Sequence, residues 1–251
     1  MTTPKRSLAL LYTTFPKASE EFLRREALEL LKRSDVEVAF FSILGGGEVF
    51  EGVKVTRLKV WEVLWAIAQG LGLLFLRPRI WRFLAPPRTG GWSNWGENAL
   101  GVAAGIVWAG RLGKYDALHA QWGSAPAMAA LVAKELGGIK QYTMGLHAYD
   151  LFERGGDGYL EEKSAASAGI ISSNACAWEE VRRRFPSANS VMIRRCLEMY
   201  PMVPKGKRVG RCELISVGRL IEKKGFEELL DIAAALKAEG FPFRLRIVGE
   251  G

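Results

Sequence analysis

Cysteine and histidine are both scarce in this sequence. The three cysteines, Cys176, Cys196 and Cys212, are unevenly spaced and include no CxxC pair. They therefore offer neither a disulfide framework nor a thiolate metal site, and they indicate reduced thiols in a cytosolic protein. The sequence also lacks a hydrolase nucleophile elbow, an HExxH motif, a P-loop and a kinase signature. These absences argue against the corresponding enzyme classes and leave His119 and His147 as the two histidines to explain.

A hydrophobic run long enough to span a membrane is also missing. The longest apolar segment, residues 63–76, is shorter than the roughly 20 residues that a spanning helix needs. Its borders are rich in tryptophan and basic residues, namely Lys59, Trp61, Trp65, Arg77, Arg79, Trp81 and Arg82. Such borders are typical of a helix that lies in the membrane interface. An ordinary pair of buried helices is the favoured interpretation, and contact with an anionic membrane surface is the alternative hypothesis.

Acidic residues are outnumbered, because 35 Lys and Arg residues face 27 Asp and Glu residues and give a net charge of +8. The excess is concentrated in residues 182–211, where nine basic side chains accompany a single acid, Glu198. A basic surface suits phosphorylated substrates or anionic lipid, and a solvated surface without a partner is the alternative. Nucleic acid is not expected as a partner, because the sequence has no recognisable binding motif and no interleaved stacking aromatics.

Strand-like and helix-like patterns alternate along the first 200 residues. The expected strands are residues 8–12, 36–43, 117–119, 141–146, 169–172 and 191–193. The expected helices are residues 20–32, 61–84, 98–112, 125–136, 161–168 and 175–185, with Ser19 as the N-cap of the first and a turn-rich segment over residues 86–94. This alternation predicts an α/β fold with a parallel, doubly wound sheet covered by helices on both faces.

The expected domain organisation has three parts. Residues 1–200 form a Rossmann-like domain, and the polar, Pro- and Gly-containing residues 201–211 form a linker. Residues 212–251 form the start of a second domain, a single βαβ unit with its helix over residues 226–238. So short a unit should leave an apolar face that needs neighbouring strands. We therefore expect the sequence to be C-terminally truncated within this second domain.

Two cations stand beside the first strand of this βαβ unit. Arg219 and Lys224 follow the apolar residues 214–217, in a turn that also holds Gly218 and Gly225. Ligands of open α/β sheets bind at the carboxyl edge of the strands, where this turn lies. A guanidinium can bind two oxygens at once and an ammonium adds a point charge, so the pair suits a diphosphate.

Both histidines are expected at strand ends, where they could point into one crevice. His147 is the stronger candidate, because the sequence His-Ala-Tyr-Asp places the Asp150 carboxylate three residues later. A hydrogen-bonded structural histidine is the alternative for each, and it is the favoured one for His119. Residues 13–20 join the first strand to its helix, and their hydroxyls and Lys17 could either contact an anionic group or merely cap the helix.

Four motifs, in order along the chain, carry a family resemblance. They are Phe15-Pro-x-x-Ser-Glu20-x-Phe22, His119-Ala-x-x-Gly123, Thr143-x-x-x-His147-Ala-x-Asp150, and Val217-Gly-Arg-Leu220 with Lys224-Gly225 and Ile247-Val-Gly249-x-Gly251. On these motifs the chain resembles a family 4 glycosyltransferase of the GT-B fold, closest in character to bacterial exopolysaccharide enzymes. The resemblance covers the whole chain. It implies a complete N-terminal Rossmann-like domain on the acceptor side, followed by the beginning of a nucleotide-sugar-binding domain.

The resemblance implies transfer of a sugar from a nucleotide-diphosphate sugar to a glycan or lipid-linked acceptor, with retention of configuration, in cell-surface polysaccharide synthesis. It implies neither a metal ion nor another cofactor. The catalytic residues would be His147, Arg219 and Lys224, and the donor-binding residues Gly218, Arg219, Lys224 and Gly249. The acceptor side would be shaped by Phe15, Ser19, Glu20, His119 and Asp150. Contact with the donor phosphates is the alternative for Asp150 and for the loop from Phe15 to Glu20. The protein would be cytoplasmic, at the inner face of the plasma membrane.

The sequence departs from the family pattern in three places. Thr13-Thr14-Phe15-Pro16 replaces the glycine-rich first loop, and Leu197-Glu198-Met199 replaces the usual Gly-hydrophobic-Asp before the linker. The distal Glu-x7-Glu region, which binds the donor, is absent. The chain alone is therefore expected to show little or no transfer. The alternative function is a non-catalytic acceptor- or membrane-binding module that pairs with a separate donor-binding half.

Overall fold

The computed structural model describes residues 5–76, 78–85, 89, 91–195 and 212–251. The chain divides into two units, residues 1–196 and residues 197–251. The expected linker over residues 201–211 lies outside the described residues, as do Cys196 and the segment Leu197-Glu198-Met199. Cys176 and Cys212, in the described parts, are free thiols.

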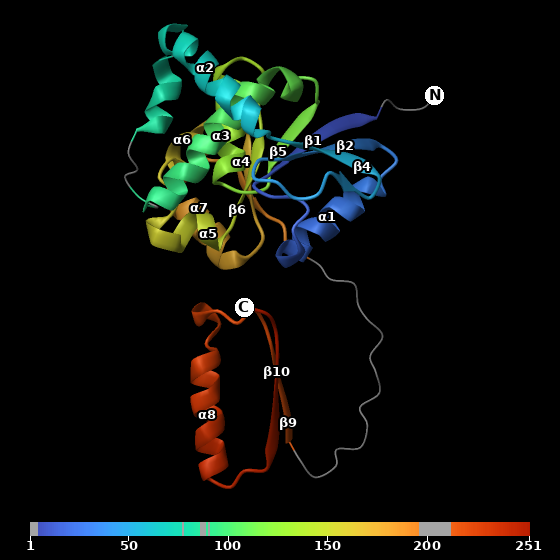
Figure 1. The fold of residues 1–251 in the computed structure, drawn as a ribbon, viewed down its shortest axis with the longest axis vertical. Helices are drawn as coiled ribbons and strands as arrows, with labels where there is room; N and C mark the ends of the chain where they lie inside the picture. The colour runs from blue at the N-terminus through green and yellow to red at the C-terminus, as the bar shows by residue number, and fades with distance from the viewer. Residues whose placement is uncertain (1–4, 77, 86–88, 90, 196–211) are drawn as a thin grey trace. The chain divides into compact units, whose positions relative to one another are not determined.

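The first unit is built on an eight-stranded sheet in the order β3-β4-β2-β1-β5-β6-β7-β8 (Figure 1). Neighbouring strands are parallel except β3 and β4, which form an antiparallel hairpin. The strands are β1 (Arg6–Tyr12), β2 (Val36–Ser42), β3 (Val49–Phe50), β4 (Val53–Arg57), β5 (Ala117–Ala120), β6 (Thr143–Leu146), β7 (Gly169–Ser172) and β8 (Ser190–Met192). The predicted parallel, doubly wound sheet is confirmed, and the β3–β4 hairpin is an addition to it.

Helices connect these strands. They are η1 (Ala18–Glu20), α1 (Glu21–Leu31), α2 (Val60–Leu76), η2 (Pro78–Leu84), α3 (Gly91–Leu112), α4 (Ala125–Glu135), α5 (Ala148–Phe152), η3 (Glu153–Gly155), α6 (Leu160–Ala166) and α7 (Ala175–Arg184). The prediction of Ser19 as the N-cap of α1 is wrong, because the 3-10 turn η1 comes first and Glu20 occupies the N-cap position.

Helix α3 begins at Gly91 instead of Asn98, inside the segment predicted as turns. The glycine, serine and asparagine residues of this segment are poor helix formers, which is why the sequence pattern missed it. Tertiary contacts stabilise the first turns of the helix. The Asn94 amide donates to the Asp157 carboxylate at 2.8 Å, and the Trp95 indole donates to a main-chain carbonyl of η2 at 3.3 Å.

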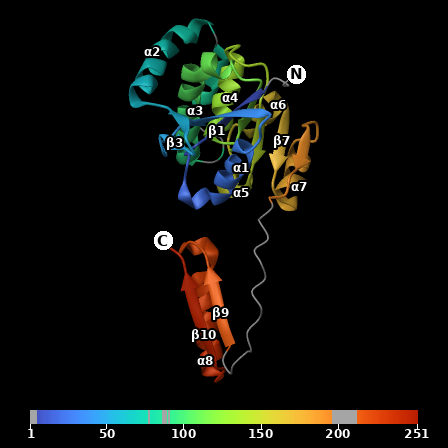
Figure 2. The ribbon, with the colours of Figure 1, turned by 90° about the vertical axis from the view of Figure 1, so that its right-hand side faces the viewer.

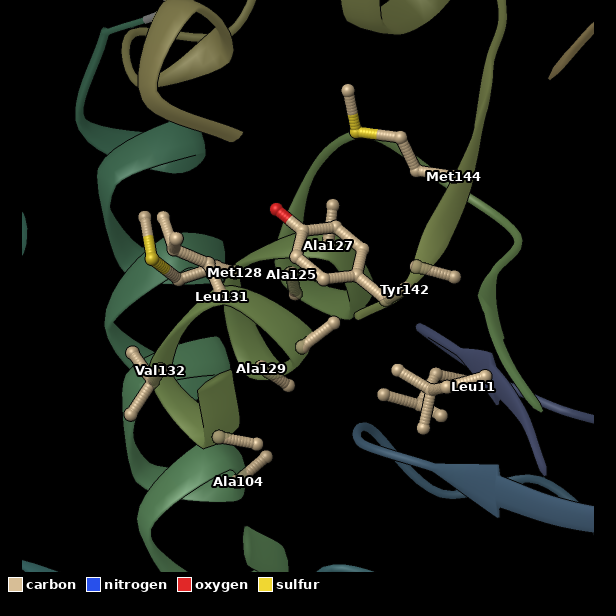
Figure 3. Packing of buried hydrophobic residues seen from close by; sticks show 14 of the residues in the cluster. Leu11, Ala104, Ala125, Ala127, Met128, Ala129, Leu131, Val132, Tyr142 and Met144 are labelled. Carbon is tan, nitrogen blue, oxygen red and sulfur yellow. The ribbon is translucent and has the colours of Figure 1, made fainter. Parts of the chain in front are cut away.

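The sheet is covered on both faces. On one face, Leu23 and Ala27 of α1 pack in a core with Phe40. Helices α3, α4, α6 and α7 contribute to a second core. Figure 3 shows part of it, where Leu11 of β1 and Met144 of β6 lie beside the alanine-rich helix α4. Helix α4 is almost wholly buried, so it forms a rigid support for the loop that precedes it.

The sheet has a topological switch point between β1 and β5. From β1 the chain continues to β2 and β4 on one side, whereas β5 to β8 occupy the other side. Loops that follow the two central strands diverge at such a point and leave room for a ligand. Here these loops are residues 13–17 after β1 and residues 121–124 after β5.

Helix α2 exposes apolar side chains. Trp61, Leu64, Trp65 and Ile67 are between 48% and 62% exposed, and we call them the exposed α2 face. On the opposite side of the helix, Glu62 is buried and accepts a hydrogen bond from an arginine of α3. Among the described residues, no helix combines the length and the apolar character that crossing a bilayer would require.

The second unit is a single βαβ element, drawn in red in Figure 2. It consists of β9 (Cys212–Val217), η4 (Glu222–Lys224), α8 (Phe226–Ala238) and β10 (Phe243–Val248). The two strands are parallel, with Val217 opposite Val248. The predicted βαβ unit is therefore confirmed. No residue of β9, α8 or β10 is buried, and Ile215 and Val217 form part of an exposed apolar face, as expected.

Candidate functional site

His147 follows β6 directly and precedes helix α5. Its Nε2 atom lies 3.0 Å from the main-chain carbonyl oxygen of Gln121, the residue after β5. Gly145 leaves room for this contact, since a Cβ atom there would lie 2.9 Å from the Gln121 oxygen and 3.3 Å from His147 Nε2. The imidazole is thus held between the ends of two neighbouring strands, at the edge of the sheet where the sequence predicts it.

The contacts of His147 define its protonation state. A carbonyl oxygen only accepts hydrogen bonds, so Nε2 carries the proton and Nδ1 keeps its lone pair. Burial, with a smaller contribution from the Arg195 cation, lowers the pKa of His147 to about 4. The ring is therefore neutral at pH 7, and its single N–H is already engaged.

Three side chains surround the His147 ring. Trp122 meets it edge to face with ring centroids 4.6 Å apart, and Phe22 of α1 does so at 6.1 Å. Arg195, which lies beyond β8, places Nη2 3.4 Å from His147 Nδ1. We call Phe22, Trp122, His147 and Arg195 the His147 cluster. Its members follow β1, β5, β6 and β8, so the cluster lies at the carboxyl edge of the sheet.

Asp150, the predicted neighbour of His147, is 1% exposed and contacts the backbone of His147 instead of its ring. Its Oδ2 atom accepts a hydrogen bond from the His147 N–H at 3.0 Å. Burial raises the pKa of Asp150 to about 7. Gly123 makes room for the carboxyl group, because a Cβ atom there would lie 3.1 Å from Asp150 Cγ. Asp150 is therefore buried and positions the His147 turn, and its acceptor-side role stays a prediction.

A buried ion pair, which the sequence analysis missed, lies beside this turn. Lys163 Nζ donates to Asp157 Oδ1 at 2.7 Å, to Asn98 Oδ1 at 2.7 Å and to the Gly123 carbonyl at 2.6 Å. Both side chains of the pair are 0% exposed. Burial by itself would raise the pKa of Asp157, but Lys163 and two asparagine amides hold it below its ordinary value. The ionised pair thus links α3, α6 and the loop after β5.

His119 lies within β5 and not at its end, because the strand extends to Ala120. The residue is buried, and its Nδ1 atom is 2.8 Å from Thr143 Oγ1 on the neighbouring strand. Burial lowers the pKa of His119 to about 4. These contacts match the structural alternative, and the expected position of His119 in a crevice is corrected to one inside the sheet.

The loop after β1 divides its predicted residues between core and surface. Phe15 is 1% exposed and stacks on an aromatic ring of β1, and its N–H donates to Ser42 Oγ at 2.9 Å. Its ring therefore belongs to the core, and the acceptor-side role of Phe15 stays a prediction. Ser19 is exposed. Glu20 forms an ion pair with Lys17 at 2.8 Å. The Lys17 ammonium, which the sequence suggested could contact an anionic group, is therefore already paired.

In the second unit, Arg219 and Lys224 are exposed and follow the carboxyl end of β9, as the sequence predicts. Neither side chain forms a hydrogen bond or an ion pair with another described residue. Gly249 has a steric role, since a Cβ atom there would lie 1.8 Å from the Gly218 carbonyl oxygen. At Gly218 the nearest neighbour of an added Cβ atom would be a carbon of Phe226 at 3.5 Å, which is ordinary van der Waals contact.

Within the first unit, the structure brings His147 and Asp150 together. Trp122 and Phe22 were not predicted as members of the cluster, although both lie inside the four sequence motifs. Arg195 and Lys163 carry no distinguishing sequence signal. Arg195 is one of many basic residues in its stretch, and the burial of Lys163 depends on residues 40 to 65 positions away.

Comparisons with known proteins define the fold class. No protein-family model matches the chain, and no curated protein matches it either. Among solved structures, UGT2 of Phytolacca americana in complex with UDP-2-fluoro-glucose and pterostilbene is similar, with a TM-score of 0.51 and 11% sequence identity. The likeness covers 97% of this chain, which spans 66% of the length of the UGT2 chain. The chain therefore has the α/β fold of GT-B glycosyltransferases, as the sequence predicts.

Proposed function

We propose that the chain takes part in glycosyl transfer from a nucleotide-diphosphate sugar to a glycan or lipid-linked acceptor. The observation that carries this proposal is the likeness of nearly the whole chain to UGT2, whose structure contains UDP-2-fluoro-glucose. The four sequence motifs support the finer assignment, a retaining enzyme of family 4 that acts in cell-surface polysaccharide synthesis. The alternative is a non-catalytic acceptor- or membrane-binding module that pairs with a separate donor-binding half.

Arg219 and Lys224 would bind the donor diphosphate. Both are exposed and have no partner among the described residues, so their charges are available to an anion. Negative charge grows on the diphosphate as its bond to the anomeric carbon breaks, and fixed cations stabilise that charge. We propose that these side chains take the place of a metal ion, so that neither a metal nor another cofactor is needed. Gly218 would let the diphosphate approach the backbone.

His147 would face the transferred sugar without moving a proton. Its ring is neutral at pH 7, and its N–H is engaged with the Gln121 carbonyl oxygen. A nucleoside diphosphate departs as a stable anion, so general acid catalysis at the leaving group is not required. The imidazole would therefore supply shape and a fixed dipole. Ser19 and Glu20, in the 3-10 turn η1 that precedes α1, stay our candidates for the acceptor side.

Donor binding to the full chain tests this proposal. We expect calorimetry against a panel of UDP-, GDP- and dTDP-sugars to identify a donor, and Arg219→Ala to weaken its binding roughly tenfold, because a charged hydrogen bond is lost. Lys237→Ala, which removes an exposed cation of α8, should bind the donor like the wild type. Absence of donor binding, or equal binding by Arg219→Ala, would contradict the proposal. Donor hydrolysis by the chain would support catalysis, whereas a chain that binds no nucleotide sugar would favour the non-catalytic alternative.

A cytoplasmic location at the plasma membrane is part of the proposal. The exposed α2 face combines two tryptophans with aliphatic side chains, which is the composition that interfacial helices insert among lipid headgroups. Lys59 precedes α2, and Arg79 and Arg82 lie in η2 after it. All three side chains are exposed and would contact anionic lipid. Flotation with anionic liposomes at low salt should recover the wild type and lose the Trp61→Ser/Trp65→Ser variant. Trp92→Ser, an exposed tryptophan of α3, is the control, and failure of the wild type to float would refute the contact.

A further inference from the structure

Arg195 is the charged side chain of the His147 cluster. The Phe22 ring and the neutral His147 imidazole hold its guanidinium in position. Its guanidinium carbon lies 3.6 Å from the centroid of the Phe22 ring. Its Nη2 atom lies 3.4 Å from His147 Nδ1, the nitrogen that keeps a lone pair. An aromatic face and a lone-pair acceptor together orient the plane of the guanidinium. Neither of them neutralises its charge.

The Arg195 cation has no counter-ion in the part of the chain that the structure describes, since none of the ion pairs there includes it. Burial lowers the pKa of Arg195, and the carboxylate of Glu26 partly opposes that shift. Glu26 is itself engaged, because its Oε1 atom accepts a hydrogen bond from the Gln121 amide at 3.2 Å. A partly desolvated cation without a paired anion is unfavourable, and a bound anion would relieve that cost.

The donors of Arg195 match an oxyanion. A guanidinium has five N–H groups in a fixed fork, and among the described residues His147 is the hydrogen-bonding partner of Arg195. The free edge of the fork can therefore bind two oxygens of one phosphate group. The residue is exposed, so a ligand can reach it.

We infer that Arg195, oriented by Phe22 and His147, is an oxyanion-binding residue that contacts a phosphate group of a substrate. This inference rests on the proposed function, because glycosyl transfer supplies the phosphate-containing substrates that Arg195 would bind. The same chemistry recognises the diphosphate of a nucleotide donor and the phosphate of a phosphorylated acceptor.

The test observes His147 in the full chain through the NMR signals of its imidazole nitrogens, with His119 as the internal reference. UDP and glucose 1-phosphate are titrated separately. We expect a saturable shift of the His147 Nδ1 signal while the His119 signals stay in place. Arg195→Met should raise the apparent Kd roughly tenfold, and Arg195→Lys, which keeps the charge and loses the fork, should raise it less. Arg182→Met, which removes an arginine stacked on Trp178, is the matched control and should titrate like the wild type.

Each outcome decides the inference. A shift with UDP assigns the phosphate to the donor, and a shift with glucose 1-phosphate assigns it to the acceptor. An unmoved His147 signal with both ligands, or an Arg195→Met variant that titrates like the wild type, would overturn the inference. If Arg195→Met alters the His119 signals and so the fold, Arg195→Lys takes its place. If donor binding did not depend on Arg219 while the His147 shifts still depended on Arg195, the proposed glycosyl transfer would be overturned and the inference about Arg195 would stand.

Discussion

At the scale of single residues, Asp150 and Asp157 lie close to one buried network and have opposite pKa shifts. Burial raises the pKa of Asp150 to about 7, and its Oδ1 atom has no hydrogen-bond partner among the described residues. Asp157 is as buried, yet Lys163 and two asparagine amides hold its pKa below the ordinary value. The hydrogen-bonding and charged neighbours of each carboxyl group therefore determine whether it is ionised. The spacing of residues in the sequence does not reveal these neighbours.

The first prediction concerns Asp150→Asn. Because the native pKa is raised above the value of 3.8 for an exposed carboxyl group, the native state keeps a proton that the unfolded state releases. Wild-type stability should therefore fall relative to Asp150→Asn as the pH rises toward 7. We expect the variant to gain about 2 kcal/mol in relative free energy of unfolding between pH 5 and pH 8. Urea unfolding at the two pH values measures it, and parallel pH profiles would contradict it.

Asp157→Asn is the matched control for this prediction. It removes the partner of Lys163 and leaves a buried cation unpaired, which typically costs about 3–5 kcal/mol. Because Asp157 is ionised across this range, the loss should be similar at pH 5 and pH 8. If the loss of stability in Asp157→Asn grew strongly between pH 5 and pH 8, the carboxyl group that titrates in this range would be Asp157 and not Asp150.

At the scale of elements, the two glycines of the second unit have different reasons to be glycine. Gly249 lies against the Gly218 carbonyl oxygen, and the Gly218 N–H donates to the Val248 carbonyl at 3.0 Å. A side chain at position 249 would push these strand ends apart, whereas one at position 218 would make ordinary contact with Phe226. The sequence motif treats both glycines alike, and the register of β9 and β10 separates them.

The second prediction follows from that difference. Gly249→Ala should destabilise the β9–β10 pairing by about 1–3 kcal/mol, as overpacking does. Gly218→Ala should change it by less than about 0.5 kcal/mol, so any loss of donor affinity in that variant would reflect ligand contact. Amide hydrogen exchange of β9 and β10 measures both. Equal exchange in the two variants would contradict the steric distinction.

At the scale of the whole molecule, the two units differ in how much they bury. The first has two packed cores on its eight-stranded sheet, whereas no residue of β9, α8 or β10 is buried in the second. Free energy of unfolding comes mainly from buried apolar surface, so local stability should differ greatly between the units.

The third prediction is that limited proteolysis of the full chain cuts within residues 212–251 much earlier than within residues 91–195. The backbone of the second unit opens locally at low cost, because few apolar contacts oppose opening. Mass spectrometry of the fragments over time locates the cuts. If residues 212–251 resisted proteolysis as well as the first unit does, the expected difference in stability would be contradicted. Gly249→Ala, in which the β9–β10 pairing is destabilised, should be cut in residues 212–251 earlier still and serves as the reference.

The sequence predicted well wherever one local pattern was sufficient. Alternating strand and helix patterns indicated the parallel sheet, and helix α8 has the bounds expected from its periodicity. The prediction failed where contacts with residues distant in the sequence determine the structure. The first turns of α3 depend on Asp157, and His119 of β5 is held by Thr143 of β6. Local composition cannot reveal contacts between residues 24 to 63 positions apart.

The order of elements, the α/β class and the chemical types at strand ends follow from the sequence alone, because periodicity and turn residues are local properties. The tertiary structure settles which of those residues are buried and which lie together. It buried Phe15, His119 and Asp150, and it assembled Phe22, Trp122, His147 and Arg195 from the ends of four strands. The physical reason is that burial, pKa and charge compensation depend on neighbours in space, and a doubly wound sheet takes those neighbours from distant parts of the chain.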